Sequence, residues 1–590
     1  MLQMSDFFAL LPICFILLIL SIYTLTNPAS WKTLNRHEQL NFAPDESARA
    51  LPVLIIGAGP TGLTLAAILT RYGVPVRIID RKDGLSNTTK ATNLMQRSQE
   101  YMFALGLHDS LTKASGQMRR LMVHAYGKCF GPRTMHLPES PFPNVLLCGQ
   151  DRFERILLQN LVQLGVEVEF STELIGLEGN EELVSTKWIK NGQEEEKRFS
   201  YAIGCDGHSG ITRKFTKLDF QPERTGVIIR QVDCTLQWKR SSTTDQMWLF
   251  YFDRGFAAVI PLPEDNWRVL FAQPKTDVPE REPTIEEMQT KLRAVTDDHA
   301  LLLSKPRWYS FTDLAMGIAP RMIDGRVILA GDACNPVLPN GGQGMNTGIG
   351  DAFNLGWKLA AIYHHDGPKA LLQSYNRERH AVRVELQSAQ FNGLKFTTLC
   401  TPKLLQVAFR WLAEPVLNAG GELAMARAFS ELTLHTRRSD LTAERLWTRG
   451  INAGDRVLNA PVVHELVSIQ LYDLIYRGAW TLFGFSGRTL NVHAETLDVA
   501  LRRLERPDLE TFIISTVNDF SSSFPILYDL DEEVHRLYGV GAPSVYLIRP
   551  DGYVAVRTSL SNIVVLQKYL RTWLPNASQK FSLLPSNRKL

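Results

Sequence analysis

LPVLIIGAGPTGLTLAAILTRYGVPVRIID, residues 51–80, is the stretch from which the fold of this chain can be predicted. The apolar run Val53–Ile56 is short and bounded, as a buried strand is. Residues 63–72 carry the small and apolar side chains of a helix that packs on a sheet, and Val76–Ile79 predicts a second strand. The order strand, helix, strand predicts a βαβ unit of an open parallel sheet.

Glycines at G-x-G-x-x-G spacing lie between the first strand and the helix. The first permits a tight turn, the second lets the backbone approach a pyrophosphate, and the third lets the helix lie close to the strand. An acidic residue at the end of the second strand can accept from ribose hydroxyls. A glycine-rich turn without a ligand is the alternative, and this context disfavours it. The predicted dinucleotide site comprises Gly57, Gly59, Pro60, Thr61, Gly62, Asp80 and Arg81.

Length and composition are those of an ordinary globular protein with several domains. The chain has 590 residues, 45% of them hydrophobic, and a net charge of +3. Because no basic block stands out, we expect no nucleic-acid partner. The seven cysteines show no C-x-x-C pair and no metal spacing, which favours scattered reduced thiols over a disulfide framework or a metal site.

The N-terminal region departs from this pattern. Residues 7–25 form a run without a charged side chain, and its length is close to the ~20 residues that cross a bilayer as a helix. Lys32 and Arg36 follow it, and the positive-inside tendency would place the rest of the chain in the cytoplasm. The sequence predicts a single-pass membrane anchor in residues 1–30, which we favour over a cleaved signal peptide, and a linker over residues 31–50.

Further polar groups are predicted near the carboxyl ends of the strands. Lys90 lies in a Ser/Thr/Asn-rich loop and is a candidate cation for the pyrophosphate, although a solvated loop lysine is equally compatible. Gln150 begins an amphipathic helix over residues 150–164 that also carries Arg152. A strand over residues 199–206 ends in Asp206-Gly207, a pair that is also common in ordinary turns.

The strand predicted over residues 325–332 ends in Gly-Asp, at Asp332, and is followed by a glycine-rich loop. This loop contains Pro339 and leads to a helix that starts near Asn346. Such a helix start can direct free N–H groups at a ligand atom that becomes negative. A reduced flavin carries its negative charge near N1 and the C2 oxygen, so the loop suits a flavin. The loop and helix start contribute Pro339, Gly342, Gly344, Met345 and Asn346 as candidate contacts.

Strand-like runs rich in aromatic residues fill residues 221–314. They predict an antiparallel sheet inserted into the nucleotide-binding domain. Aromatic stripes on strands are more often core than pocket. We therefore name no substrate contact from the sequence.

These segments together resemble the single-component FAD-dependent aromatic hydroxylases. These are flavoprotein monooxygenases of the p-hydroxybenzoate hydroxylase fold, and the similarity is to their phenol hydroxylase-like and polyketide hydroxylase-like branch. GAGPTG at 57–62, the DG pair at 206–207 and the GD pair at 331–332 occur in the order of the family. PNGGQGMNTGIGDAFNLGWKLA after the last pair and LLQSYNRERHAV at 371–382 extend the resemblance, which covers about residues 51–400.

The resemblance implies roles for the candidate residues. Asp80 would hold the FAD ribose, Lys90 would stand where the family usually has Arg, and Asp332 would reach the ribityl chain. Asp206 lies in the motif implicated in FAD pyrophosphate and NAD(P)H binding, Gln150 lies near the flavin, and Gly344, Met345 and Asn346 would line the isoalloxazine edge. Two departures from the family are Cys334-Asn335, where Ala-His is frequent, and His208-Ser209 after the DG pair.

The C-terminal part resembles the extra domain of phenol hydroxylase-like members. Residues 454–456, GDR, are similar to the segment that opens it, and the strand and helix patterns of residues 511–557 look like a thioredoxin fold. Ala542-Pro543 lies where such folds place a cis-proline. Because no cysteine occurs after Cys400, this domain cannot do dithiol chemistry, and a structural or dimerising role is expected.

The predicted fold is therefore α/β. A Rossmann-type FAD-binding domain (51–220 and 315–400) holds an inserted antiparallel-sheet substrate domain (221–314). A helical connector (401–450) and a thioredoxin-like domain (451–580) follow, and an N-terminal transmembrane helix precedes them.

The resemblance implies that NAD(P)H and O2 are used to hydroxylate a phenolic or polycyclic aromatic substrate through a flavin C4a-hydroperoxide. Catalysis is then centred on the flavin, and no side chain is assigned as catalytic. A membrane-anchored flavin epoxidase or hydroxylase of a lipidic substrate is an alternative, favoured by the apolar N-terminus and opposed by the thioredoxin-like tail. A non-catalytic flavin-binding module, motivated by Cys334-Asn335, is another. The substrate, the choice of NADH or NADPH, and a homodimer stay open.

Overall fold

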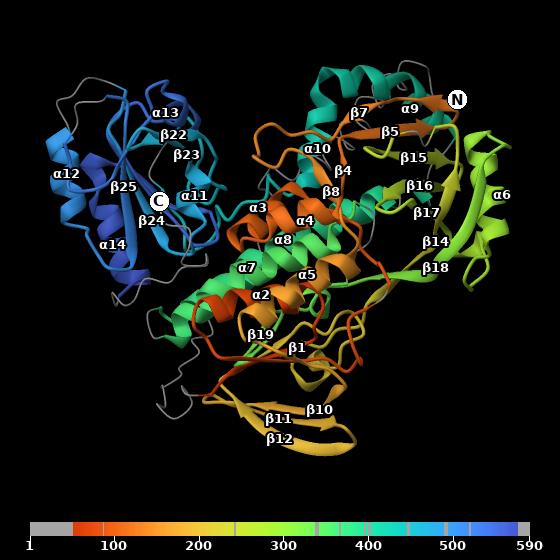
Figure 1. Cartoon of the computed structure of the whole chain (residues 1–590), viewed down its shortest axis with the longest axis horizontal. Coiled ribbons are helices and arrows are strands. Elements are labelled where there is room, and N and C mark those ends of the chain that lie inside the picture. Colours follow the sequence, from red (N-terminus) through yellow and green to blue (C-terminus); the bar gives the residue numbers. More distant parts are fainter. Residues whose placement is uncertain are drawn as a thin grey trace, which may run out of the picture.

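The structure is a computed structural model that describes residues 51–575 with short gaps. The gaps are 87, 241–242, 337–340, 365–366, 395–396, 399–402, 445–448, 489–493 and 518–520. Figure 1 shows a nucleotide-binding part around a parallel sheet, a part built on a large second sheet, and a C-terminal part with a sheet of its own.

The parallel sheet has six strands in the order β19-β20-β13-β1-β2-β9, and all neighbours except β19 and β20 run parallel. Its strands are β1 (Val53–Ile56), β2 (Val76–Ile79), β9 (Val168–Glu169), β13 (Tyr201–Gly204), β19 (Ile323–Asp324) and β20 (Val327–Leu329). The predicted βαβ unit is present as β1, α2 (Pro60–Arg71) and β2. The strand predicted to end in Asp332 gives way to a short 3-10 turn at Gly331–Ala333.

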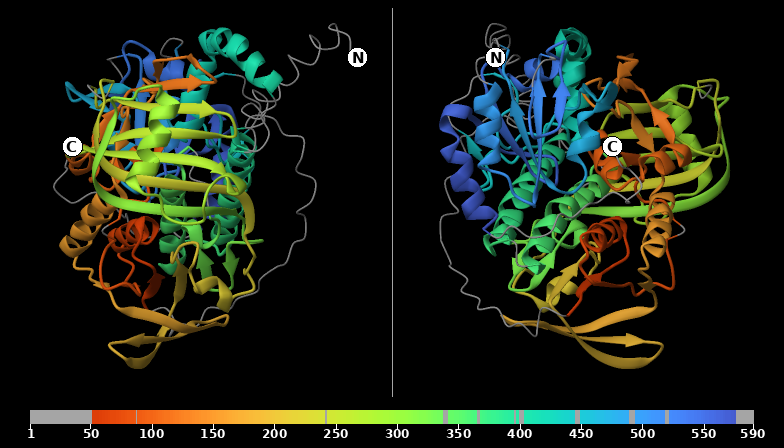
Figure 2. Two further views of the ribbon diagram at one scale, coloured as in Figure 1. Left: turned by 90° about the vertical axis from the view of Figure 1, so that its right-hand side faces the viewer. Right: turned by 60° about the vertical axis from the view of Figure 1, so that its left-hand side comes forward.

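Both faces of this sheet are covered, which explains the unbroken apolar run in β1. Val53 and Ile55 pack against α2 and against α7 (Gly344–Tyr363). Leu54 and Ile56 point the other way and pack against a three-stranded sheet. That sheet consists of β10 (Thr172–Gly179), β11 (Val184–Lys190) and β12 (Gln193–Phe199). Figure 2 shows it at one end of the molecule.

The second large sheet has the order β18-β14-β17-β16-β15-β5-β6, with β7 paired to β5. Its later strands are β14 (Glu223–Gln237), β15 (Gln246–Phe252), β16 (Gly255–Leu262), β17 (Asn266–Pro274) and β18 (Leu302–Met316). The earlier part of the chain supplies β5 (Arg120–Ala125), β6 (Lys128–Cys129) and β7 (Arg133–Thr134). The predicted boundary at residue 220 therefore needs correction, because β15 pairs in parallel with β5, a contact between segments far apart in sequence.

The aromatic residues of this sheet divide between its two faces. One face packs against α6 (Ile285–Thr296) and forms a core that includes Trp248, Phe250, Trp267 and Phe271. Tyr251 and Phe256 point away from α6 and line a cavity on the other face. Strand alternation thus turns one aromatic-rich sequence into both core and cavity wall.

Small elements and helices join the two sheets. The strands β3 (Asn93–Leu94), β4 (Gly116–Met118) and β8 (Val145–Leu147) form a short sheet between helices α3 (Gln96–Ala104), α4 (His108–Ala114) and α5 (Gln150–Gln163). After α7 follow α8 (Ala370–Leu394), α9 (Lys403–Val416), a kinked π turn at Leu417–Gly421, and α10 (Glu422–Ser430). Within the predicted helical connector, residues 401–450, the structure has helices over residues 403–430, and these helices also form a wall of the cavity.

The C-terminal part contains an eight-stranded sheet in the order β21-β28-β27-β24-β25-β26-β22-β23. Its strands are β21 (Ala443–Glu444), β22 (Pro461–His464), β23 (Val467–Gln470), β24 (Trp480–Phe485), β25 (Leu509–Ser515), β26 (Ile526–Tyr528), β27 (Ser544–Ile548) and β28 (Val554–Ser559). Its helices are α11 (Leu471–Ile475), α12 (Ala494–Arg502), α13 (Glu533–Tyr538) and α14 (Val564–Trp573). Among the described residues the cis peptide bond is Gly131–Pro132, so the prediction of a cis bond at Ala542–Pro543 is wrong.

The predicted membrane location is also corrected. Within residues 51–575, as far as they are described, no helix combines the length and apolar composition that crossing a bilayer requires. The predicted span, residues 7–25, and the predicted linker, residues 31–50, lie outside the described residues. The homodimer stays a prediction.

Candidate active site

A cavity of about 2270 Å³ runs from the carboxyl ends of the parallel strands to the second large sheet. Its volume is more than twice that of a usual ligand pocket, about 300–1000 Å³. The glycine turn after β1, the loop after β2, the loop after β13 and the start of α7 line one end. The other end lies between strands β15–β18 and helices α8–α10.

The glycine turn shows three different reasons for glycine. Gly57 has φ +107°, and a Cβ there would lie 2.5 Å from the Cys205 carbonyl oxygen. A Cβ on Gly62 would lie 2.0 Å from the Gly57 carbonyl oxygen, so α2 could not approach the turn. A Cβ on Gly59 would meet no protein atom within 4 Å, yet Gly59 lines the cavity. The fold therefore does not require glycine at position 59, and the reason that the motif offers for this glycine is close approach of a pyrophosphate.

Two helix N-termini open into the same cavity. The N-cap of α2 is Gly59 and that of α7 is Gln343, and neither makes a side-chain cap hydrogen bond. Because the first N–H groups of a helix have no acceptor within the helix and the helix dipole favours negative charge there, both helix starts suit a negatively charged ligand atom. Gly344 and Met345 line the cavity at the start of α7, as predicted for contacts to a flavin edge.

Asp80 holds the glycine turn and the following loop in place. Its Oδ2 accepts from the Ala58 N–H at 2.8 Å and its Oδ1 accepts from the Lys82 N–H at 2.9 Å. Each carboxylate oxygen has further acceptor capacity. The carboxylate can therefore position the turn and also accept from a ribose hydroxyl.

Asp206 and Asp332 lie on the cavity wall with acceptor capacity unused. Thr212 donates to Asp206 Oδ2 from its N–H and hydroxyl, both at 2.8 Å, while Oδ1 is buried without a partner in the described part of the chain. The described residues likewise make no hydrogen bond to the Asp332 carboxylate. Burial raises the pKa of Asp332, although the Arg383 and His208 charges oppose this effect. Both carboxyl groups can accept hydrogen bonds from hydroxyl groups of a nucleotide.

The basic and amide side chains predicted to contact the cofactor divide into two groups. Arg81 and Lys90 line the cavity, and Gln150 does so too, accepting from the Ala91 N–H at 3.3 Å. Arg152 does not: it points away and pairs with Glu264 at 2.6 Å, so its predicted role as a cofactor contact is corrected. The i, i+2 spacing in α5 places Gln150 and Arg152 on different sides of the helix.

Most of the other predicted residues also meet at this cavity. Its lining contains Gly57, Gly59, Pro60, Thr61, Asp80, Asp206, Gly207, Asp332 and Gly342. Asn346 is fully buried and does not line the cavity. Its Oδ1 accepts from the Met95 N–H at 2.8 Å and its Nδ2 donates to the Gly342 carbonyl at 2.8 Å. The structure thus places Asn346 to support the loop. Pro339 lies outside the described residues.

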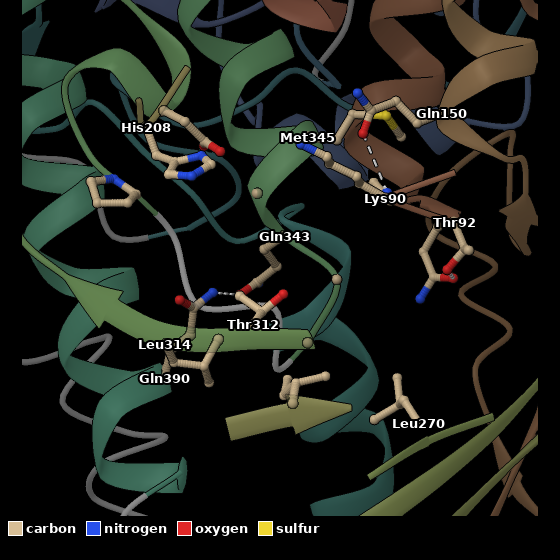
Figure 3. A pocket seen from close by; sticks show the side chains of 18 of the residues that line it. Lys90, Thr92, Gln150, His208, Leu270, Thr312, Leu314, Gln343, Met345 and Gln390 are labelled. Carbon is tan, nitrogen blue, oxygen red and sulfur yellow. Dashed lines mark hydrogen bonds between the residues drawn. The ribbon is translucent and has the colours of Figure 1, made fainter. Parts of the chain in front are cut away.

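The far end of the cavity contains residues that the sequence did not single out. In Figure 3, Gln343 and Gln390 lie with Thr312 and Leu314 away from Lys90 and Gln150. Gln390 Nε2 donates to Gln343 Oε1 at 3.0 Å. For α10, which also lies at this end of the cavity, the available sequence signals were the Gly420-Gly421 pair before the helix and the amphipathic pattern of the helix itself. Neither signal indicates which surface the helix faces.

The comparisons with known proteins agree with this geometry. The family model "FAD binding domain" matches residues 50–389. The chain belongs to this FAD-binding family. A relative, the uncharacterized aromatic compound monooxygenase YhjG of Bacillus subtilis, is 31% identical over 89% of this chain and 98% of the relative. The 6-methylpretetramide 4-monooxygenase of Streptomyces rimosus is 29% identical over 88% of this chain and 93% of the relative.

A solved structure shows the same fold. The anhydrotetracycline hydroxylase OxyS from Streptomyces rimosus superposes with a TM-score of 0.67 at 24% identity and covers 90% of this chain and 100% of that chain. The resemblance to FAD-dependent aromatic hydroxylases is confirmed. The chain is an FAD-dependent monooxygenase of that type, with FAD as its cofactor and NAD(P)H as the co-substrate typical of the family.

A buried carboxyl group next to α7 is expected to make the stability of the fold depend on pH. Glu431 ends α10 and accepts from the Thr347 hydroxyl at 3.2 Å. Burial raises the pKa of Glu431 from 4.5 to about 7, although the Arg379 charge opposes this effect. Because the folded-state pKa is the higher one, this contribution to stability is present at low pH and is lost as the pH rises through 7.

We expect Glu431→Gln to remove this dependence. Between pH 5 and pH 8 the original chain should lose up to about 3 kcal/mol of unfolding free energy relative to the variant. Urea unfolding of both proteins at the two pH values measures the difference. If the difference in unfolding free energy between the two proteins were the same at both pH values, the raised pKa of Glu431 would be contradicted.

Proposed function

We propose that this monooxygenase hydroxylates an aromatic substrate held at the apolar end of the cavity, using NAD(P)H and O2. One observation carries the proposal: Gly59 of the dinucleotide turn and Leu270 of the second sheet line one continuous cavity. A cofactor on the glycine turn and the start of α7 would thus adjoin a substrate between the sheet and the helices. When bound, FAD supplies the oxygen-activating redox chemistry.

The residues of this chain bind and orient the cofactor. The turn at Gly57–Gly62 and the Lys90 ammonium would hold the pyrophosphate, and Asp80 would accept from the adenosine ribose. Asp332 would accept from the ribityl hydroxyls. The N–H groups at the start of α7 would stabilise negative charge on the reduced ring.

The apolar end of the cavity would exclude water from the reacting atoms. Met247, Leu249 and Leu270 face it from the sheet, and Met425 and Phe429 face it from α10. Water exclusion protects reactive intermediates from hydrolysis and side reactions. The apolar N-terminus that favoured the lipidic-substrate alternative lies outside the described residues, and the non-catalytic alternative is a matter for experiment.

We also propose the thioredoxin-like assignment of the C-terminal part. The arrangement that supports it is β24 and β25 in parallel, with α12 between them in sequence, and the antiparallel hairpin β27-β28 followed by α14. The proposed division of the chain keeps the predicted domains with two changes. Strands β5–β7 belong to the substrate sheet, and α9 and α10 belong to the cavity wall.

The test is flavin content followed by substrate-dependent turnover. Purified protein should show the absorption bands of bound flavin, and NADPH and O2 consumption should rise when a hydroxylatable aromatic compound is added. Product analysis should show one oxygen atom inserted for each NADPH in the coupled reaction. Bound flavin without stimulation by any phenolic or polycyclic compound would favour a non-catalytic module, and a protein that cannot be reconstituted with FAD would refute the proposal.

A further inference from the structure

A buried arginine forms an ion pair on the cavity side of the second large sheet. Arg268 of β17 and Asp233 of β14 are register partners on neighbouring strands, and their side chains are 3% and 4% exposed. The Nε and Nη2 groups of Arg268 donate to the two carboxylate oxygens of Asp233, both at 2.8 Å. This bidentate contact fixes the plane of the guanidinium group.

The other N–H groups of Arg268 reach the loop after β2, which carries Lys90. Nη1 donates to the Lys90 carbonyl oxygen at 2.8 Å, and Nη2 also donates to the Thr89 carbonyl oxygen. The guanidinium carbon lies 5.1 Å from the centre of the Trp308 ring of β18. The five-donor fork of arginine satisfies one carboxylate and two carbonyl groups at once, which the three donors of a lysine ammonium cannot do.

Helix α5 also holds this loop. The Thr89 hydroxyl donates to Asp151 Oδ1 at 2.5 Å. The Ala91 N–H donates to Gln150 Oε1 at 3.3 Å, and the Gln150 N–H donates to the Ala91 carbonyl oxygen at 2.9 Å. The backbone on both sides of Lys90 is therefore held in place. The Lys90 side chain itself is exposed and lines the cavity, and Figure 3 shows it beside Gln150.

The loop explains the buried Arg268–Asp233 pair better than the stability of the sheet does. Taking two charges out of water is costly, and a buried ion pair can often be replaced by apolar residues without loss of stability. Ile260 of β16 is the other register partner of Arg268, and Leu270 follows on the same face of β17, so apolar side chains suit this face. The arginine adds a connection between the sheet and the loop.

We propose that Arg268 is a positioning residue for FAD binding, which holds the loop backbone so that the Lys90 ammonium group meets the pyrophosphate. The inference rests on the placement of the pyrophosphate beside Lys90 in the proposed function. Arg268 acts through Lys90: because the backbone is held, the long side chain of Lys90 has less freedom to lose when the cofactor binds. A residue of the second large sheet thereby contributes to cofactor affinity.

A double-mutant cycle tests the inference, with FAD titrated into the full-chain apoprotein and flavin fluorescence as the readout. Lys90→Met should raise the FAD dissociation constant by about tenfold, because a charge-assisted contact to the pyrophosphate is lost. Arg268→Lys keeps a positive charge beside Asp233 but loses the bridge to the loop, and it should raise the constant by about fivefold. In the Lys90→Met background, Arg268→Lys should raise the constant by less than about twofold.

Two further variants separate positioning from a general effect on the fold. Arg230→Lys makes the same change at another buried arginine of this sheet, which pairs with Glu287 of α6 on the opposite face, and FAD affinity should stay unchanged. Arg268→Met combined with Asp233→Leu removes the ion pair without leaving a buried charge. This pair variant should keep the urea midpoint of the original chain, while its FAD affinity falls as in Arg268→Lys.

A loss of FAD affinity that depends on the Lys90 side chain would support the inference. Unchanged affinity when Arg268 is replaced, unchanged affinity in Lys90→Met, or an equal effect of Arg268→Lys with and without the Lys90 side chain would overturn it. The last result would mean a general structural effect or a direct contact of Arg268 with the cofactor. Because the readout is FAD binding alone, failure of aromatic compounds to stimulate NADPH oxidation would refute the hydroxylase function and leave this result unchanged.

Discussion

Replacing Gly59 with valine is expected to weaken FAD binding strongly while leaving the chain folded. Gly59 has φ −82° and ψ −176°, an extended conformation that a β-branched residue adopts without strain. No protein atom lies within 4 Å of an added Cβ. The valine would instead occupy cavity space between the turn and the α2 N-terminus, where we place the pyrophosphate. We expect the FAD dissociation constant to rise at least about 100-fold, which corresponds to about 2.7 kcal/mol.

Two further glycine variants control this experiment. Gly84→Val also adds a Cβ that meets no atom within 4 Å, but Gly84 does not line the cavity, so FAD affinity should stay unchanged. Gly62→Ala brings a Cβ to 2.0 Å from the Gly57 carbonyl oxygen and should destabilise the fold itself. Flavin retained on purification and reconstitution titrations give the affinities, and thermal unfolding of the apoproteins gives the stabilities. Unchanged FAD affinity in Gly59→Val would mean that the pyrophosphate does not lie against this turn.

The second large effect is expected where the C-terminal part meets helices α7 and α8 of the FAD-binding domain. Glu378 of α8 accepts from Arg549 Nη1 and Nη2 at 2.8 and 2.9 Å and from Lys358 Nζ at 2.8 Å. Arg549 follows β27, whereas Lys358 belongs to α7. All three side chains are at most 1% exposed. Burial alone would raise the pKa of Glu378, yet the two cations hold it well below its usual range.

Glu378→Gln should therefore destabilise the whole chain. Arg549 would keep its positive charge in a buried place with Asp551 as its remaining carboxylate partner, and Lys358, whose pKa burial already lowers to about 8, would lose its ion-pair partner. Breaking a buried ion pair in this way costs about 3–5 kcal/mol. The midpoint of urea unfolding should therefore fall. Bound flavin should be lost in the earliest unfolding transition, because Lys358 of the affected cluster belongs to α7.

The matched control is Glu532→Gln in the same C-terminal part. Glu532 pairs with Arg488 at 2.6 Å, but both side chains are about one-third or more exposed. Exposed pairs contribute about 0–1 kcal/mol, so the urea midpoint should change little. A comparable midpoint for the two variants would show that the buried cluster does not hold the parts together.

The sequence determined the local elements and the chemistry that adjoins them. The glycine spacing, the apolar run of β1 and Asp80 indicated a dinucleotide site because backbone geometry is set by neighbours in the chain. The DG and GD pairs added two further strand ends. Those predictions needed contacts only within short segments or between strands of one parallel sheet.

The tertiary structure decided what faces the second half of the cavity. Pairing of β5 with β15 joins residues more than a hundred positions apart, and no local pattern encodes that register. Likewise, α10 has the periodicity of a core-packing helix, and only the tertiary structure shows that Ala424 lines the cavity. Arg152 was misassigned for the same reason, since its partner Glu264 comes from another strand connection. Hydrophobic periodicity specifies which face of an element is buried, whereas the identity of the opposing surface depends on long-range packing.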